Sequence, residues 1–463
     1  MNNKTMLTVV QANDGNIIDE IPLQNHRDIN NMLAAAAALF QDRQQWLPAY
    51  RRIEILKRLI ILMQTEADDF ALLIAREGGK PLTDARIEVS RAINGVELAI
   101  EAIAQLKGEQ IPMDLSAAGA GRLAFTTKEP VGVVVAVSAF NHPLNLIVHQ
   151  VVPAIACGCP VIIKPAADTP LCCLRFVELV HQAGLPSAWC QTSVCDRATA
   201  QALVTDPRVA FFSFIGSAKV GWDLRRQLAP GVRCTLEHGG VAPVIVAADA
   251  DLNMAVPLLV KGGYYHAGQV CVSVQRVYVD NAIKAAFIDA LAKQVRTLVV
   301  GDPTETATEV GPLIRPAEVD RIEQWVNEAV TAGAQCEVGG ERLGKHHYAP
   351  TLLIDPPLDS KVSTLEIFGP VISVYGYDDI KNAINQANAL PVAFQAAVFT
   401  QDIQQAISTA QTLDAAAVMI NDHTAFRVDW MPFAGHRTSG LGVGGIAYTM
   451  DDMTQDKLLV IKG

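Results

Sequence analysis

Apolar residues in the first part of the chain recur with the spacing of one helix face. Residues 50–77 repeat isoleucine, leucine and methionine three or four positions apart, which predicts an amphipathic helix. The alanine-rich stretch Ile29–Phe40 and the run Ala85–Leu106 continue the helical pattern, and Lys80-Pro81 interrupts it between two of these segments. The sequence therefore predicts a mainly helical region at the start of the chain.

From Val131 onward, short apolar strands alternate with helices. VGVVVAVSAF (131–140) and VIIKPA (161–166) are continuous apolar runs, which are typical of strands buried on both faces of a sheet. A helix is expected after each of them, and two further strand–helix rounds include the strand Val209–Ile215. A second series begins near Cys234 and continues to about Ser439. This alternation predicts an α/β fold with two doubly wound, mostly parallel sheets.

Charge and composition exclude several classes of partner. Asp and Glu total 48 against 37 Lys and Arg, a net charge of −11, which argues against nucleic-acid binding. The apolar runs are shorter than the roughly 20 residues that cross a bilayer, and the opening residues lack a secretory-signal pattern, so we expect no membrane partner and a cytoplasmic location. The nine cysteines show neither a CxxC pair nor a Cys/His ligand spacing, so we expect neither disulfides nor a metal.

Two short stretches carry candidate reactive groups. In GQVC, Cys271 follows Ala267-Gly268, which permits close backbone approach; at the head of a strand or helix its pKa would be lowered, as a nucleophile requires. The alternative is a small buried apolar residue. In LEHGG, Glu237 precedes two glycines, which favours a buried carboxylate of raised pKa that can activate water. The alternative is a surface carboxylate.

Two further stretches are weaker signals when taken alone. Asn141 lies in FNHP at the end of a predicted strand, where its side chain either caps the following helix or donates to a developing oxyanion. EIFGP places Glu366 and Phe368 before a Gly-Pro turn, which by itself indicates a loop with a buried aromatic ring.

Taken together and in this order, these stretches resemble the aldehyde dehydrogenase superfamily over essentially the whole chain. PVGVVVAVSAFNHP, IIKPA, FSFIGS, LEHGG, GQVC, EIFGP and PFAGHRTSGLG are each similar to a motif of that family. The resemblance implies that Cys271 attacks an aldehyde, that Asn141 and the Cys271 amide hold the oxyanion, and that Glu237 activates water to release the acid. Because Glu237 is present, hydrolysis is favoured over transfer to coenzyme A, and a non-catalytic relative is disfavoured.

The resemblance also implies a nicotinamide cofactor, NAD or NADP, with NAD somewhat favoured. Lys164 would bind the adenosine ribose. Gly216 and Ser217 would lie near the pyrophosphate and nicotinamide, and Glu366 and Phe368 would hold the nicotinamide ribose.

Three departures from the family pattern leave details open. Ala167 replaces a glutamate, which removes one barrier to NADP. The turn Ser193–Thr199 lacks the usual glycine, so the adenine-side contacts are open. His238 replaces a leucine, and it is either a tolerated core histidine or a group that tunes Glu237 or Cys271 near neutral pH.

FNHPLN and the segment 421–446 resemble the branch that contains phosphonoacetaldehyde and lactaldehyde dehydrogenases. In the phosphonoacetaldehyde type, the positions matching His142, Arg91 and Arg427 grip the anionic head group, and phosphonoacetaldehyde is the leading expectation for the substrate. Val270 and Gly95 stand where two cations occur in that type. Their loss favours the alternative, lactaldehyde or another short semialdehyde.

The resemblance finally implies a division into domains and an oligomer. A dinucleotide-binding domain is expected over 1–121 and 131–235, a catalytic domain over 236–440, and a bridging arm over 122–130 and 441–463. The last strand, Leu458–Ile461, together with Arg122–Thr127 is expected to join subunits in a homodimer or homotetramer.

Overall fold

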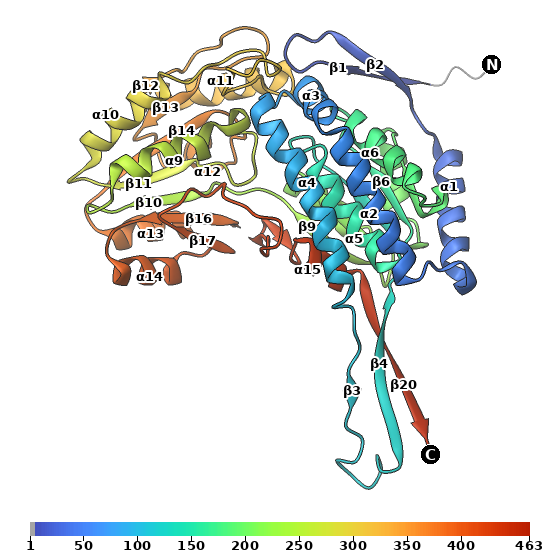
Figure 1. Ribbon diagram of the computed structural model, residues 1–463. Coiled ribbons are helices and arrows are strands. Elements are labelled where there is room, and N and C mark those ends of the chain that lie inside the picture. The colour runs from blue at the N-terminus through green and yellow to red at the C-terminus, as the bar shows by residue number, and fades with distance from the viewer. Residues whose placement is uncertain (1–4) are drawn as a thin grey trace.

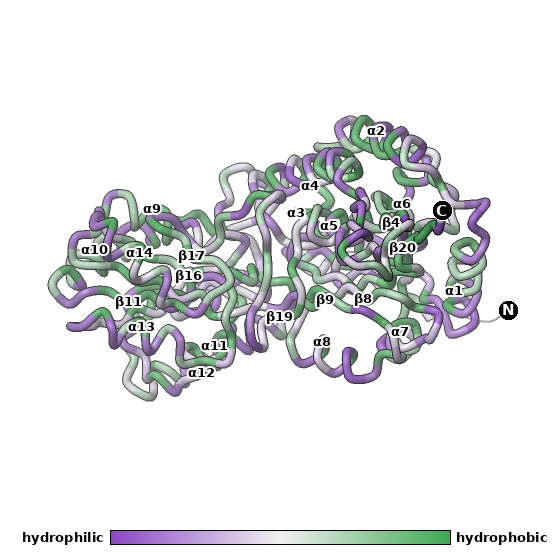
Figure 2. The backbone as a smooth tube through the Cα atoms, turned by 90° about the horizontal axis from the view of Figure 1, so that it is seen from below, coloured by the Kyte–Doolittle hydropathy of each residue, from purple (hydrophilic) through white to green (hydrophobic). Residues whose placement is uncertain are grey.

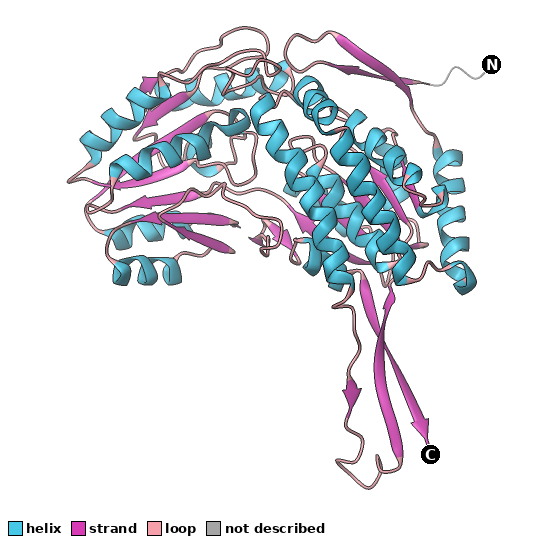
Figure 3. Ribbon diagram, in the orientation of Figure 1, coloured by secondary structure: helices cyan, strands magenta, loops and turns pink. Residues whose placement is uncertain are grey.

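The computed structural model describes residues 5–463, which form two α/β lobes and a projecting β arm (Figure 1). Strands lie inside each lobe and helices cover them (Figure 3). Seen from below, α9 to α14 belong to one lobe and α1, α2 and α5 to α8 to the other (Figure 2). Residues 1–4, on which the argument about a secretory signal rests in part, lie outside the described residues. In residues 5–463 no helix has the length and apolar character that a membrane span requires.

The first lobe is built on a six-stranded sheet. Its strands are parallel except at the β19 edge, and their sheet order is β19 (Gly440–Leu441), β9 (Arg233–Glu237), β8 (Val209–Ile215), β5 (Val133–Val137), β6 (Val161–Lys164) and β7 (Cys190–Thr192). Successive residues of β5 face opposite layers: Val134 packs with one helical layer and Val135 with the other. Both faces are therefore covered, which explains the continuous apolar run that predicted this strand.

Helices of the first lobe form two layers on this sheet. One layer holds α2 (Ala49–Thr65), α3 (Ala67–Gly78), α4 (Leu82–Ile103), α5 (Asn145–Cys157), α6 (Leu171–Gln182) and α15 (Ile446–Asp452). The other includes α1 (His26–Gln41), α7 (Arg197–Val204) and α8 (Ala218–Arg225). The single helix expected over 50–77 is wrong, because the chain turns at Glu66, where α2 ends and α3 begins.

The second lobe is built on a seven-stranded sheet, so the predicted α/β fold with two mostly parallel sheets is confirmed. The order is β12 (Gln335–Val338), β13 (Thr351–Ile354), β14 (Val371–Tyr377), β11 (Arg276–Asp280), β10 (Pro243–Val246), β16 (Gln395–Phe399) and β17 (Ala417–Ile420), with only β12 antiparallel among these seven strands. Its helices are α9 (Leu252–Tyr264), α10 (Lys284–Val295), α11 (Pro316–Thr331), α12 (Lys361–Thr364), α13 (Ile380–Asn388) and α14 (Ile403–Thr412).

Two boundaries differ from the expected ones. The second series was expected to begin near Cys234, with a division between residues 235 and 236, but β9 pairs with β8 and lies wholly in the first sheet. The second sheet begins at β10. The segment 441–463 is also divided, because α15 packs in the core of the first lobe and only β20 (Thr454–Lys462) enters the arm.

The arm is a three-stranded sheet in the order β20, β4 (Arg122–Pro130) and β3 (Gln110–Ile111). β20 pairs with β4 of its own chain along the whole strand, from Thr454 opposite Pro130 to Lys462 opposite Arg122. Leu458 and Ile461 are each about half exposed. Short elements complete the chain: β1 (Met6–Val10), β2 (Ile17–Pro22), β15 (Val392–Ala393), β18 (His436–Arg437) and the 3-10 turns at Arg43–Gln45, Ser187–Trp189 and Tyr265–Gly268.

Candidate active site

The stretches singled out in the sequence converge on one cavity of about 440 Å³, to which both lobes contribute. The first lobe contributes Asn141, after β5, and Glu237, at the end of β9. The second contributes Cys271, before β11, and Glu366, before β14. The carboxyl ends of β5 and β9, the edge at which α/β sheets bind ligands, therefore face the segments that precede β11 and β14 across this cavity.

The loop that carries Cys271 is held in a strained conformation. His266 and Ala267 have φ of +49° and +53°, in the left-handed region that non-glycine residues rarely adopt. Gly268 follows with φ of +70°, and a Cβ there would lie 2.0 Å from the carbonyl oxygen of Gly369. Gln269 anchors the loop, because its Oε1 accepts from the Ile314 amide at 2.9 Å and its Nε2 donates to the Pro312 carbonyl at 3.2 Å. These contacts fix the position of the thiol.

The expected low pKa of Cys271 is wrong. Burial raises the pKa of the thiol well above its usual value, and the carboxylates of Glu237 and Glu366 raise it further, while Arg427 opposes them. Cys271 also lies in a turn and heads neither a strand nor a helix, and the backbone contribution that lowers its pKa comes from its own amide. The thiol must therefore give its proton to a base before it can attack.

Asn141 does not cap a helix. Its Nδ2 donates to the Gln269 carbonyl at 2.9 Å, which ties it to the loop of the nucleophile. The amides of Leu144, which precedes α5, and of Asn145, its first residue, donate instead to Oε1 of Glu88, at 2.9 and 3.1 Å. An amide carries two hydrogens, so Asn141 has one left to donate into the cavity.

Glu237 has the environment expected of a general base. Burial raises the pKa of its carboxyl, and the nearby guanidinium of Arg427 opposes this. Its backbone is fixed because its carbonyl oxygen accepts from the Gly216 amide at 3.0 Å. Gly444, from the C-terminal loop, flanks the carboxylate, and a Cβ there would lie 3.3 Å from Oε2.

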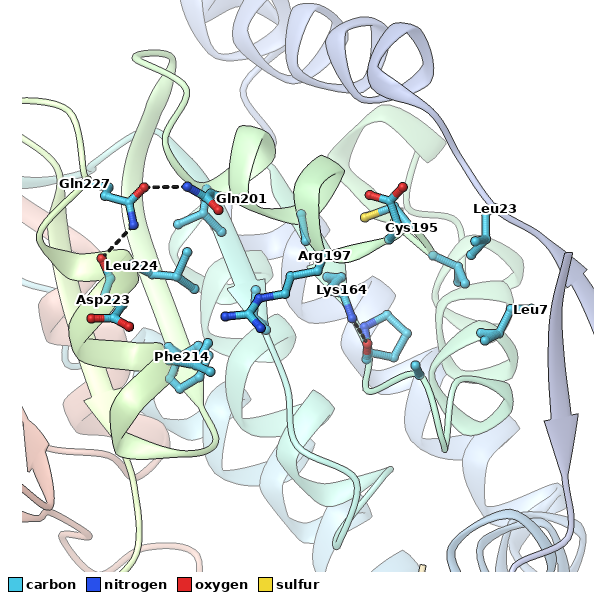
Figure 4. A pocket seen from close by; sticks show the side chains of 18 of the residues that line it. Leu7, Leu23, Lys164, Cys195, Arg197, Gln201, Phe214, Asp223, Leu224 and Gln227 are labelled. Atoms are coloured by element: carbon cyan, nitrogen blue, oxygen red, sulfur yellow. Dashed lines mark hydrogen bonds between the residues drawn. The ribbon is translucent and has the colours of Figure 1, made fainter. Parts of the chain in front are cut away.

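The residues expected to bind a cofactor are distributed over two adjoining cavities. Lys164 lines the larger, of about 660 Å³, shown in Figure 4. Gly216, Ser217, Glu366 and Phe368 line the catalytic cavity. Val137, Phe214 and Val220 line both cavities, so the two cavities adjoin, as a dinucleotide that extends from one to the other requires.

The donor set fits a dinucleotide. Oε1 of Glu366 is buried and has no partner among the described residues, and burial raises the pKa of this carboxyl to about 8. A buried carboxyl without a partner suits a ribose hydroxyl, which can both donate and accept. Gly216 has φ of +156° and no side chain, so its backbone is open to a ligand at the start of α8.

The three residues expected to hold the anionic head group of the substrate differ in whether their side chains are free to bind it. Arg91 directs Nε and Nη2 at the carboxylate of Asp429, at 3.0 and 2.8 Å. His142 is kept neutral, because burial and then the charges of Lys80 and Arg91 hold its pKa well below the usual value. Arg427 stacks over the ring of Phe433 at 3.6 Å, and its buried Nε has no partner among the described residues.

Several residues in or beside the cavity were not singled out from the sequence. Tyr265 places its hydroxyl 3.3 Å from Nε2 of His142, and Phe433 lies under Arg427. Asp429 lies two positions after Arg427, in a segment that resembles the family. Its nearness to a predicted site residue could have marked it as a candidate for the site. Arg315 lines the cavity from the second lobe, with nothing in its local sequence to indicate it.

His238 hydrogen-bonds to the backbone of the chain rather than to the Glu237 carboxyl or the Cys271 thiol. Its Nδ1 lies 2.8 Å from the Gly216 carbonyl oxygen, so Nδ1 carries the hydrogen. Burial lowers the pKa of the ring, which keeps it uncharged at neutral pH. Its Nε2 is buried without a partner among the described residues. The ring therefore fixes the turn between β8 and α8.

Comparisons with known proteins agree with this geometry. The model of the aldehyde dehydrogenase family matches residues 1–459. The 3-sulfolactaldehyde dehydrogenase of Priestia aryabhattai is 38% identical over 443 residues, covering 96% of this chain and 92% of that protein. The lactaldehyde dehydrogenase of Methanocaldococcus jannaschii is 33% identical over 464 residues, covering 99% and 98%. The crystal structure of a glyceraldehyde-3-phosphate dehydrogenase from the same species, complexed with NADP, has a TM-score of 0.94 and 33% identity, with 100% of both chains covered.

Proposed function

The chain belongs to the aldehyde dehydrogenase family, and we propose that it oxidises a short 2-hydroxyaldehyde with an anionic head group to the carboxylic acid, using NAD or NADP. The relatives named for lactaldehyde and 3-sulfolactaldehyde support a hydroxylated three-carbon substrate. They give no support to phosphonoacetaldehyde, the leading expectation from the sequence. Lactaldehyde, the alternative, is the better supported of the two.

One observation carries the choice of an anionic head group. Arg427 is half-buried at the catalytic cavity, its Nε is buried without a hydrogen-bond partner among the described residues, and among residues 5–463 no carboxylate lies within ion-pair distance of it. A buried N–H without a partner is costly, and a sulfonate or carboxylate offers the guanidinium two oxygens. Arg91 lines the same cavity but is already paired with Asp429.

The residues present can perform the oxidation. The Cys271 thiol loses its proton to solvent water, and the thiolate sulfur adds to the aldehyde carbon. The free amide hydrogen of Asn141 and the Cys271 backbone N–H donate to the oxyanion. The nicotinamide, when bound, supplies a hydride acceptor, and loss of hydride from the adduct leaves a thioester on Cys271. Glu237 then takes a proton from water, the hydroxide attacks the thioester, and the carboxylic acid leaves as the sulfur is released.

A turnover panel tests this proposal. Formation of reduced cofactor should be followed with 3-sulfolactaldehyde, lactaldehyde, phosphonoacetaldehyde, succinic semialdehyde and hexanal, each with NAD and with NADP. We expect 3-sulfolactaldehyde to give the highest kcat/KM. If hexanal is the best substrate, the anionic pocket is wrong. If Cys271→Ser retains turnover, the thioester route is wrong.

A coenzyme A-acylating dehydrogenase is the main rival within the family. That reaction needs no water-activating base, so Glu237→Gln would leave it unaffected and turnover would depend on added coenzyme A. The buried Glu237 favours hydrolysis, and we expect turnover without coenzyme A.

A further inference from the structure

The hydroxyl of Tyr265 and the imidazole ring of His142 form a polar pair in the wall of the catalytic cavity. We propose that this pair recognises the 2-hydroxyl group of the aldehyde and makes the chain selective for 2-hydroxyaldehydes over aldehydes that lack this group. The inference rests on the proposed function, because it takes Cys271 as the residue that the aldehyde carbon joins. It replaces the role expected for His142 from the sequence, that of gripping an anionic head group.

The pair lies where the second carbon of the substrate is expected. Tyr265 and Cys271 pack against the same apolar cluster, which contains Phe433. His142 directly follows Asn141, whose remaining amide hydrogen is available to the oxyanion. The 2-hydroxyl stands on the carbon next to the one that the sulfur attacks, so in the adduct it lies beside the oxyanion. Two neighbouring oxygens of the substrate would thus contact two neighbouring residues of one loop.

Both groups of the pair are uncharged at neutral pH. Burial and the charges of Lys80 and Arg91 hold the pKa of His142 well below its usual value, and burial raises the pKa of the Tyr265 hydroxyl well above its own. A neutral pair does not supply the opposite charge that a buried sulfonate or carboxylate needs, whereas a hydroxyl needs only a donor and an acceptor. Arg427 is left for the head group, so separate residues recognise the two parts of the substrate.

The hydrogen-bonding capacity of the pair is not exhausted. The Tyr265 hydroxyl lies 3.3 Å from Nε2 of His142, which is longer than the roughly 3.0 Å that hydroxyl donors usually reach. If the phenol donates to Nε2, its oxygen can still accept, and if Nε2 carries the hydrogen, the phenol can still donate. A substrate hydroxyl both donates and accepts, so it fits either arrangement.

The ring of Tyr265 is held in place by two ammonium groups. Those of Lys80 and Lys261 lie 5.9 and 5.0 Å from the ring centroid, within the range of a cation–π contact. Each ammonium group is itself paired with a carboxylate of α4, Lys80 with Glu88 and Lys261 with Asp84. The phenol therefore has a fixed direction before the substrate arrives, as a group that selects a substrate requires.

The test compares lactaldehyde with propanal, which differ only in the 2-hydroxyl. Steady-state kcat/KM is measured for both from the formation of reduced cofactor. Tyr265→Phe removes one oxygen atom, and we expect it to lower kcat/KM for lactaldehyde about three- to tenfold, the effect of one neutral hydrogen bond. Propanal should change by less than about twofold. The different reactivities and hydration of the two aldehydes cancel when the variant is compared with the wild type.

Tyr264→Phe is the matched control, because the Tyr264 hydroxyl donates to the Thr351 carbonyl at 2.9 Å in the core of the second lobe. It should keep the lactaldehyde-to-propanal ratio of the wild type. An unchanged ratio in Tyr265→Phe overturns the proposal, and so does an equal loss for both aldehydes, which would mean that the phenol only shapes the cavity. If the wild type oxidises neither aldehyde, the proposed function fails as well, whereas an unmoved ratio with both aldehydes oxidised refutes this inference alone.

Succinic semialdehyde separates the two parts of the substrate, because it is anionic and has no 2-hydroxyl. Tyr265→Phe should leave its kcat/KM unchanged, whereas Arg427→Ala should lower it and spare lactaldehyde. A loss for succinic semialdehyde without a loss for lactaldehyde in Tyr265→Phe would show that the pair binds the head group, and the proposal would be wrong. His142→Gln, which keeps a neutral polar group, should retain the lactaldehyde-to-propanal ratio better than His142→Leu, and equal ratios in these two variants would exclude His142 from the recognition.

Discussion

The carboxylate of Asp429 accepts two hydrogen bonds from Arg91, from Nε at 3.0 Å and from Nη2 at 2.8 Å. The same carboxylate lies 2.8 Å from Nε2 of His149 and is almost completely buried. Arg91 is thereby fixed as part of the wall of the catalytic cavity, whereas Arg427, on the same wall, has no acidic partner. Two arginines that look alike in sequence therefore have different roles.

Arg427→Ala should raise KM for an anionic aldehyde. A lost charge-assisted contact costs roughly 1.5–3 kcal/mol, which is about 10- to 100-fold in kcat/KM. Lactaldehyde, which is neutral, is the control and should change by less than about threefold. The measurement is initial rate against aldehyde concentration for both substrates. Equal losses would show that Arg427 acts through Cys271 or through its packing on Phe433.

Arg91→Ala should instead destabilise the fold. It removes the arginine that donates twice to the buried Asp429 carboxylate and leaves only His149 and Asn145 in contact with it, and breaking a buried pair costs about 3 kcal/mol. A quarter of the Arg91 side chain is exposed, so solvent recovers part of that cost. Urea unfolding gives the free energy of unfolding for the variant and the wild type. A variant of unchanged stability that loses only the anionic substrate would contradict this assignment.

The sequence predicted the elements whose signal is local. The strand Val133–Val137 is buried on both faces, so it appears as an unbroken apolar run. The break at Glu66 was missed because Met63 and Phe70, on either side of it, are seven residues apart, and two helical turns preserve the periodicity. The sheet to which β9 belongs depends on its pairing with β8, which no local pattern encodes.

The candidate site was also predicted only in part, because a sequence motif carries local information and not the contacts between distant motifs. Cys271, Glu237 and Asn141 lie in short motifs, and the fold brings all three to one cavity. The pKa of Cys271 was missed because it depends on the convergence of Glu237 and Glu366, which lie in separate motifs. The partner of Arg91 is 338 residues away in sequence, and such a pair is defined only by the tertiary fold.

Glu237→Gln should lower the pKa of the Cys271 thiol. The charge of Glu237 helps to raise that pKa, so removing the charge favours the thiolate at lower pH. The measurement is the rate of alkylation by iodoacetamide against pH, with Cys271→Ser as the background from the other eight cysteines. The same variant should form reduced cofactor in a stoichiometric burst and then turn over slowly, because water is no longer activated. An alkylation profile that shifts to higher pH would contradict the proposed coupling.

Glu77 should make stability fall as the pH rises through neutrality. Its carboxylate accepts from the Leu171 and Cys172 amides at the start of α6, and burial raises its pKa from 4.5 to about 7. Between those values the folded state keeps a proton that the unfolded state releases, so stability is lost as pH rises across the window. The loss is about 3 kcal/mol at 1.36 kcal/mol per pKa unit.

Glu77→Gln cannot titrate, so it should lack this component. The measurement is urea unfolding of both proteins at about pH 4.5 and about pH 7.5, the two ends of the window. The free energy of unfolding of the wild type should fall relative to that of the variant between the two conditions. Parallel changes in both proteins would mean that the pKa of Glu77 is not raised.

His238 should contribute to cofactor binding through the backbone that it holds. Its Nδ1–H donates to the Gly216 carbonyl at 2.8 Å, and its ring packs so closely on α8 that a Cβ at Gly221 would lie 2.2 Å from Cε1. His238→Leu restores the residue common in the family but removes the donor, and we expect the cofactor to bind about fivefold more weakly, the effect of about 1 kcal/mol. His238→Asn carries an amide donor at the position of Nδ1 and should bind nearly as well as the wild type. The measurement is the dissociation constant of the cofactor by calorimetry, with kcat as the control, which should be unchanged in both variants. If leucine and asparagine weaken binding equally, the hydrogen bond to Gly216 has no part in holding the cofactor, and the histidine is a packing residue.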